Sequence, residues 1–224
     1  MINVDTVYQR VLAIANKEQR GYITPLEFNL LANQAQKEIF GSYFIELNQA
    51  LAMPGNESEY SDIVKTLNEK ISIFKTDAAL TYASGYFSYP SDMYKLGTLY
   101  AGQLSATVTG GVEIQEINYD ELLDYTNSPL TKPTETKPLY LRRTEGLSII
   151  PSTIVSGVRA TYTKKPSKVE WGYVVVNEQA LYNAGSATNF ELHTSEEITL
   201  VIKILGLAGI VIQKQDLMAL GQQA

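Results

Sequence analysis

The sequence predicts an α+β protein in which an N-terminal helical bundle, completed by a long C-terminal helix, carries an inserted antiparallel β-domain. Apolar residues recur at helical spacing through the N-terminal third of the chain and again from Thr194 onwards. Between these regions lie short apolar segments bounded by glycine, proline and asparagine, which is typical of strands. Helices and strands that are segregated along the chain in this way favour α+β over alternating α/β.

The domain boundaries follow from the same pattern. Residues 1–74 and 194–224 are expected to form the helical bundle. Residues 75–193 are expected to form the β-rich domain, as a sandwich or a barrel, with a short helix near residues 119–126. A chain of 224 residues has ample length for a core in such an arrangement.

The composition is that of a globular chain with an excess of tyrosine. The 15 Tyr outnumber the 6 Phe and the 1 Trp. Tyrosine suits both half-buried strands and protein–protein contacts, so both explanations stay open. The absence of cysteine excludes disulfides and thiolate chemistry. The formal net charge of −6 argues against a large nucleic-acid footprint, which needs clustered Lys and Arg.

Helical periodicity predicts three N-terminal helices. Residues 4–15 place six apolar side chains on one face, and residues 59–71 form the third helix with four apolar side chains facing inwards. The second helix runs from Pro25 to about Met53. Its length of roughly 40 Å at 1.5 Å per residue makes it a spine along which other elements pack.

A complete helix-start signal precedes this second helix. Thr24 can serve as the N-cap, Pro25 fits the first helical position, and Glu27 completes a capping box. The chain turns on a glycine just before Thr24, and we expect Arg20 and Tyr22 to be exposed on that turn.

The β-region is expected to contain two hairpins and several further strands. Asn118 can cap a short helix over residues 119–125, and the three prolines within residues 128–138 predict an irregular loop. Residues 169–176 form either another strand or an extended loop. The expected strands are residues 80–82 with 86–89, 95–101, 112–117, 139–143 with 147–150, and 158–164.

The last helix is expected to begin at Thr194, with Glu197 at capping-box spacing, and to continue through the remaining length. Residues 198–212 are almost entirely apolar but too short for a membrane span. A helix this apolar must be buried on more than one side. It is either a central core helix or a helix that also meets a neighbouring subunit, in which case Gly206 and Gly209 would let a second backbone approach closely.

The sequence offers no positive case for catalysis. His193 is the only histidine, and its place beside the predicted N-cap suits a capping or surface role better than a catalytic one. Zinc sites built from His and Cys are excluded because the ligands are missing. No calcium-binding loop, P-loop or dinucleotide-binding glycine pattern is present. We therefore expect no catalytic residue, no metal and no cofactor.

The segment from Lys17 to Asn29 resembles the N-terminus of neck and tail-ring proteins from crAss-like and related short-tailed bacteriophages. The order of N-terminal helices, β-rich domain and final helix is also similar to that of the tail tubular adaptor proteins of short-tailed phages. Several short segments of the β-region are also similar to the corresponding segments of that family. These are residues 89–96, 137–140 with 147–151, and 158–162 with Pro166.

The resemblance implies a non-enzymatic virion protein that forms a head–tail connector ring, commonly a dodecamer, between portal and tail. Its partners would be further copies of itself, the portal protein and other neck or tail rings. DNA would pass through the channel without sequence-specific binding. The ring would be assembled in the host cytoplasm without membrane contact and would end in the virion neck or tail. On this view, the candidates for the subunit interface are Arg20, Tyr22, Leu205, Gly206 and Gly209.

Two other classes of function compete with this interpretation. A carbohydrate- or protein-binding β-sandwich would use exposed tyrosines and Trp171. A hydrolase would use His193 together with scattered carboxylates.

Overall fold

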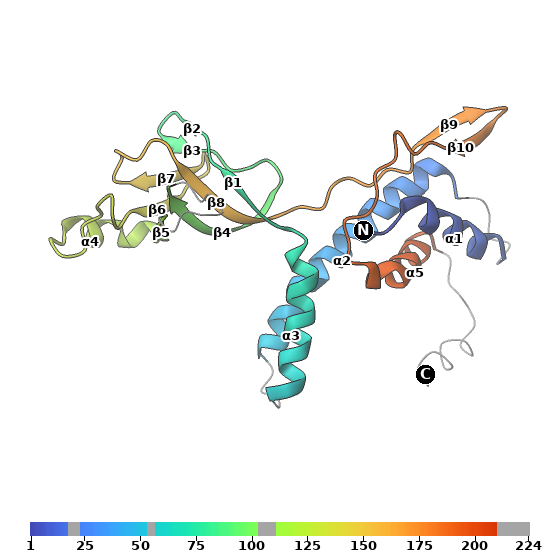
Figure 1. Ribbon diagram of the computed structural model, residues 1–224, viewed down its shortest axis with the longest axis horizontal. Helices are drawn as coiled ribbons and strands as arrows, with labels where there is room; N and C mark the ends of the chain where they lie inside the picture. The colour runs from blue at the N-terminus through green and yellow to red at the C-terminus, as the bar shows by residue number, and fades with distance from the viewer. Residues whose placement is uncertain (18–22, 53–56, 103–110, 210–224) are drawn as a thin grey trace. The chain divides into compact units, whose positions relative to one another are not determined.

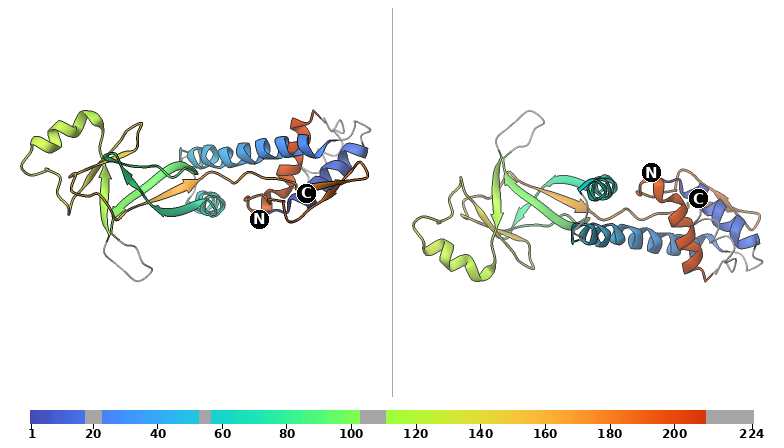
Figure 2. Two further views of the ribbon diagram at one scale, coloured as in Figure 1. Left: turned by 90° about the horizontal axis from the view of Figure 1, so that it is seen from above. Right: turned by 90° about the horizontal axis from the view of Figure 1, so that it is seen from below.

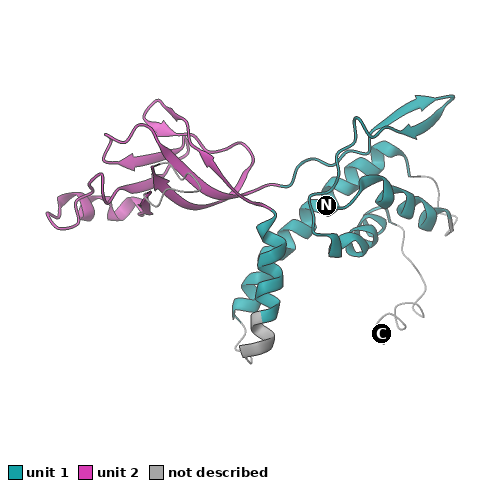
Figure 3. Cartoon of the chain, viewed as in Figure 1, with its two compact units in different colours: residues 1–73, 166–224 teal, residues 74–165 magenta. Residues whose placement is uncertain are grey.

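The predicted α+β class is confirmed by the computed structural model. Helices dominate the N-terminal part and recur near the C-terminus, with an eight-stranded sheet between them in sequence. The chain forms two compact units, unit 1 (residues 1–73 with 166–224) and unit 2 (residues 74–165) (Figure 3). The structure describes residues 1–17, 23–52, 57–102 and 111–209.

Unit 1 is organised around the long helix α2 (Pro25–Ala52). This helix contacts α3 (Glu57–Ser72) and α5 (Glu197–Leu207), while α1 (Val4–Lys17) packs against α5 (Figure 1). With 28 residues, α2 is roughly 42 Å long at 1.5 Å per residue. The predicted apolar stripes supply much of the core, with buried Val4, Val7, Tyr8, Val11, Ala15, Phe28, Ala32, Ala35, Ile39 and Tyr43.

The predicted capping box at the start of α2 is confirmed. The backbone N–H of Thr24 donates to the Glu27 carboxylate at 3.0 Å, and the backbone N–H of Glu27 donates to the Thr24 hydroxyl at 3.3 Å. The backbone hydrogen bond from Thr24 holds the pKa of Glu27 below its ordinary value. Arg20 and Tyr22, which precede this cap, lie outside the described residues.

Helix α5 differs from the sequence prediction at both ends. A 3₁₀ turn, η2 (Thr194–Glu196), precedes it. His193 rather than Thr194 is the N-cap of this turn, and its ring accepts from the backbone N–H of Ser195, while Glu196 is the N-cap of α5 itself. The prediction of a continuous helix over the remaining length is wrong, since α5 ends at Leu207. Gly209, with φ +72°, adopts the left-handed conformation that commonly terminates helices. Residues 210–224 lie outside the described part.

Unit 2 is a curled, mostly antiparallel sheet (Figure 1). Its strands follow the order β1-β8-β4-β5-β6-β7-β3-β2, and β5 pairs with β6 in parallel while the other pairs are antiparallel. The strands are β1 (Lys75–Ala79), β2 (Tyr82–Ala83), β3 (Tyr86–Phe87), β4 (Met93–Ala101), β5 (Val112–Glu116), β6 (Leu139–Arg142), β7 (Leu147–Ile150) and β8 (Val158–Lys164).

Most of the unit 2 elements were expected. The β2–β3 hairpin turns on Ser84 and Gly85, both with positive φ. Asn118 and Glu121 form a capping box that opens η1 (Tyr119–Glu121), which leads into α4 (Leu122–Asn127). Strand β1 was not predicted, because its sequence lacks the apolar alternation of a half-buried strand. The core of the sheet consists of Leu80, Phe87, Leu96, Leu99, Ile114, Tyr140, Leu147, Ile149, Val158 and Ala160.

The boundary between the units lies at Lys165, not at residue 193 as the sequence suggested. Residues 166–193 belong with the helices because their apolar side chains enter the helical core. Val169, Trp171, Phe190 and Leu192 are all buried there. This segment also holds β9 (Tyr173–Val176) and β10 (Gln179–Tyr182), a separate two-stranded sheet.

Candidate assembly surface

The β9–β10 hairpin carries a group of exposed large apolar side chains in unit 1. Its strands pair in antiparallel register, with Tyr173 opposite Tyr182 and Val176 opposite Gln179. Asn177 and Glu178 form the two-residue turn, and both have positive φ (51° and 64°). A two-residue turn with positive φ at both positions matches the right-handed twist of a hairpin.

Apolar side chains cover both faces of this hairpin. Successive residues of a strand point to opposite faces, so Val175 lies on one face and Val174 and Val176 on the other. The exposed fractions of the six large side chains range from 37% to 61%, with Val175 the most exposed. These side chains are Tyr173, Val174, Val175, Val176, Leu181 and Tyr182. An isolated two-stranded hairpin is marginally stable in water, so a hairpin with two apolar faces calls for a partner.

The base of the hairpin is anchored on Trp171. Only 3% of Trp171 is exposed, and its indole N–H donates to Asp5 Oδ1 at 2.9 Å. Its ring centroid lies 5.8 Å from those of Tyr173 and Tyr182 and 4.4 Å from that of Tyr8. Trp171 is therefore a core residue that fixes the hairpin, and it cannot serve as the exposed sugar-stacking platform of the carbohydrate-binding alternative.

Glycine is required at the next position. A β-carbon on Gly172 would collide with the side chain and backbone of Ser186. The backbone N–H of Asn183 also donates to the Gly172 carbonyl at 2.8 Å, which joins the two strands of the hairpin at its base.

A row of side-chain amides on α2 holds the segment that leads into the hairpin. Asn33 donates to the carbonyl of Val169 at 2.7 Å and accepts from its N–H at 2.9 Å. Asn29 accepts from the N–H of Trp171 at 2.7 Å. Four residues of helix rise about 6 Å and two residues of extended chain about 6.6 Å, so successive amides meet alternate residues.

Gln36 completes this amide row, which we define as Asn29, Asn33 and Gln36. Its amide donates to the carbonyl of Ser167 at 2.8 Å and accepts from the N–H of Glu191 at 3.1 Å. Gln36 is buried, and both ends of its amide are satisfied. The side chains of the amide row thus supply hydrogen bonds to the backbone of residues 167–171 that a neighbouring strand would supply in a sheet.

The predicted interface residues of the last helix fall on different faces. Leu205 is 1% exposed and packs inside its own unit, as do Leu200, Val201 and Ile204. Gly206 is exposed, and a β-carbon there would meet nothing within 4 Å. Gly209 is exposed as well. Ile198 and Ile202 are also exposed, so α5 has one exposed apolar face in the part of the chain that the structure describes.

Charged groups in unit 1 form a structural cluster. Lys70 Nζ lies 2.5 Å from Glu196 Oε1, and both side chains are largely buried. Lys70 also sits 5.7 Å from the ring centroid of Tyr43. Burial, together with the nearby Glu196 charge, raises the pKa of Tyr43. The ion pair of this cluster ties α3 to the start of α5.

In unit 2 the corresponding cluster lies on the sheet. Arg142 Nε approaches Glu116 Oε1 at 2.6 Å, and the Tyr140 hydroxyl donates to Glu116 Oε2 at 2.8 Å. Burial and this hydrogen bond raise the pKa of Tyr140 to about 12. Burial alone would raise the pKa of Glu116, but the hydrogen bonds from Arg142 and Tyr140 lower it below its ordinary value.

The candidate catalytic histidine has a local structural role. His193 Nδ1 accepts from the backbone N–H of Ser195 at 3.2 Å and lies 2.9 Å from its hydroxyl. Over the described ranges, no group of three or more His, Cys, Asp and Glu is placed to hold a metal ion. Nor does any helix in that part of the chain have the length and apolar character needed to cross a membrane.

Sequence reasoning did not predict the β9–β10 hairpin, although a signal for it is present. The pattern of residues 169–176 leaves strand and extended loop open, and it does not predict the second strand, β10. Asn177 favours positive φ, but Glu178 stands where glycine would mark a hairpin turn.

No protein-family model matches the chain, and a search of curated proteins finds no significant match.

Proposed function

We propose that the protein is a structural subunit of a homo-oligomeric ring in the neck or tail of a short-tailed bacteriophage. In this proposal the ring joins the portal to the tail and lines the channel through which DNA leaves the capsid. The subunit count that the resemblance suggests is twelve. The protein acts through its surfaces and carries out no reaction.

The observation that carries the proposal is the hairpin with apolar side chains on both faces. Its six exposed side chains leave on the order of 500 Å² uncovered, summed over the two faces of the hairpin. A standard interface buries roughly 800 Å² per partner, so the hairpin alone supplies more than half of one. The base of the hairpin is fixed to Trp171 and α2 while its apolar side chains are exposed, which supports a role in binding a partner. We refer to the hairpin in this role as the apolar arm.

The charge of the chain suits a channel for DNA. Each subunit carries a formal net charge of −6, and copies in a ring add their charges. A predominantly acidic assembly repels the DNA phosphates, so the passing DNA would not adhere.

The experiment is to measure the molar mass of the purified protein by light scattering during size-exclusion chromatography, alone and mixed with the portal protein. The parent chain is expected to form a closed oligomer in at least one condition. Val175→Asp, which places a charge on the hairpin, should shift the mass to the monomer. The matched control is Leu130→Asp, because Leu130 is 93% exposed and lies in the other unit.

The proposal is overturned if the parent chain is purely monomeric in every condition. It is also overturned if the Val175→Asp variant assembles as the parent does while circular dichroism shows it folded.

A further inference from the structure

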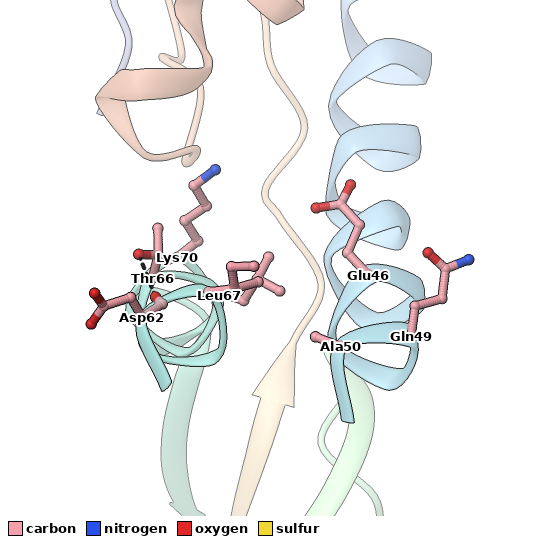
Figure 4. Close-up of a pocket in the computed structure, with 8 residues that line it drawn as sticks. Glu46, Gln49, Ala50, Asp62, Thr66, Leu67 and Lys70 are labelled. Atoms are coloured by element: carbon pink, nitrogen blue, oxygen red, sulfur yellow. Dashed lines mark hydrogen bonds between the residues drawn. The ribbon is translucent and has the colours of Figure 1, made fainter. Parts of the chain in front are cut away.

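A groove between α2 and α3 is a second apolar surface of unit 1. It has a volume of about 510 Å³. Leu67 points across towards α2, and Ile63 adds exposed apolar surface on α3 (Figure 4). The groove is lined by Glu46, Gln49, Ala50, Asp62, Ile63, Thr66, Leu67 and Lys70.

The groove and the hairpin lie towards opposite ends of α2. The hairpin is anchored at Asn29, near the N-terminal end of the helix, whereas the groove begins at Glu46. These two positions are separated by roughly 25 Å along the helix axis at 1.5 Å per residue. Both views of Figure 2 show α3 beside the C-terminal end of α2 and the hairpin near the other end.

We infer that the groove receives the β9–β10 hairpin of a neighbouring copy of this chain. The inference rests on the proposed function and names the contact that builds the ring. The hairpin cannot reach the groove of its own chain, because it is fixed at the far end of a rigid helix. A protruding apolar arm at one end and an apolar groove at the other make a heterologous, head-to-tail contact, which closes into a ring when the rotation allows.

The apolar character of the two surfaces agrees with this occupant. Residues 171–183 carry a single charged side chain, Glu178 in the turn, so the hairpin itself brings only one charge to the contact. The groove offers Ala50, Ile63 and Leu67 as its apolar lining, beside the charged side chains of Glu46, Asp62 and Lys70. The hairpin alone falls short of the roughly 800 Å² per partner of a stable interface, so a ring of such contacts gains its stability by closure.

The chain contains no cysteine, which makes site-directed cross-linking specific. Val175→Cys on the hairpin and Ile63→Cys in the groove are prepared as separate variants, since both positions are exposed and tolerate the change. Each variant is treated with a short bis-maleimide alone and as an equimolar mixture of the two, and the products are separated on a denaturing gel. Leu130→Cys mixed with Ile63→Cys is the matched control.

A covalent dimer that forms only in the Val175→Cys and Ile63→Cys mixture is the expected result. The variant carrying both cysteines should give a ladder of linked chains that ends at the subunit count of the ring. Val175→Cys linking to itself would instead show hairpin–hairpin pairing and overturn the inference.

Light scattering of the same untreated variants separates the two levels of the proposal. An assembled ring without the mixed cross-link overturns this contact and leaves the ring standing. A chain that remains monomeric contradicts the ring, and the contact falls with it.

Discussion

At the scale of single residues, Trp171 decides where the helical unit ends and the hairpin begins. Its indole fills the space between Tyr8 and the hairpin tyrosines and donates to Asp5 in the first turn of α1. Asp5 thereby serves both the positive end of the helix dipole and the indole. One residue connects the first helix, the core and the hairpin.

Trp171→Phe should destabilise unit 1 by roughly 2–4 kcal/mol, because it removes a hydrogen bond to a charged acceptor and leaves a cavity. Urea unfolding followed by circular dichroism measures the loss. Asp5→Asn is the control, since the amide oxygen still accepts from the indole and the loss should be smaller. A Trp171→Phe variant as stable as the parent would show that this anchor contributes little.

The Tyr140–Glu116 pair predicts a pH effect on unit 2. The pKa of Tyr140 is raised from 10.0 to about 12 in the folded chain. Its contribution to stability is therefore fully present below pH 10 and is lost as the pH rises through 12. Between these values the urea midpoint should fall, and it should fall less steeply for Tyr140→Phe. Equal slopes for the two proteins would contradict the prediction.

At the scale of elements, different parts of the surface of α2 make three separate structural contributions. Its apolar stripe forms the core, its amide row holds residues 167–171, and its C-terminal end forms one side of the groove. The amide row explains why the boundary between the units lies at Lys165 rather than at the predicted residue 193. Side-chain amides that bond backbone groups remove the need for a partner strand, so an extended segment can lie along a helix.

Asn33→Ala should cost roughly 1–3 kcal/mol, because the N–H and carbonyl of Val169 both lose their partner. Fluorescence of the single Trp171 should shift to longer wavelength as the segment loosens. Gln34→Ala is the matched control, since Gln34 is an exposed amide on the same helix. An unchanged spectrum and stability for Asn33→Ala would show that the row is dispensable.

Substitutions on the two faces of α5 should differ in their effect on folding, because one face is buried and the other is exposed. Leu205→Asp should abolish folding of unit 1, because it places a charge in the core. Ile202→Asp, on the exposed face of the same helix, should fold with little loss. Circular dichroism of both variants decides the point, and a folded Leu205→Asp variant would show that α5 is not a core helix.

Local signals in the sequence predicted most elements, and long-range packing decided the rest. The capping box at Thr24 and the Ser84-Gly85 turn act within a few residues, so the sequence determines them directly. Strand β1 owes its structure to pairing with β8, and its own residues give no apolar alternation. The exposed β9–β10 hairpin could not be predicted, because a strand with two exposed apolar faces has the same local sequence pattern as a buried strand.

At the scale of the whole molecule, unit 1 presents an apolar arm and an apolar groove towards opposite ends of one helix. Both are exposed among the described residues of the single chain, and the proposed head-to-tail contact would cover both in every subunit. The exposed face of α5, with Ile198, Ile202 and Gly206, is a further surface that assembly can cover. This arrangement fits a protein whose function lies in assembly.

The most direct test of the ring is electron microscopy of the purified particle, alone and in complex with the portal protein. The parent protein is expected to give ring-shaped particles around a central channel, with subunits that can be counted. These particles should disappear for Val175→Asp and persist for Leu130→Asp. Dispersed single chains in both preparations of the parent protein would contradict the proposed ring.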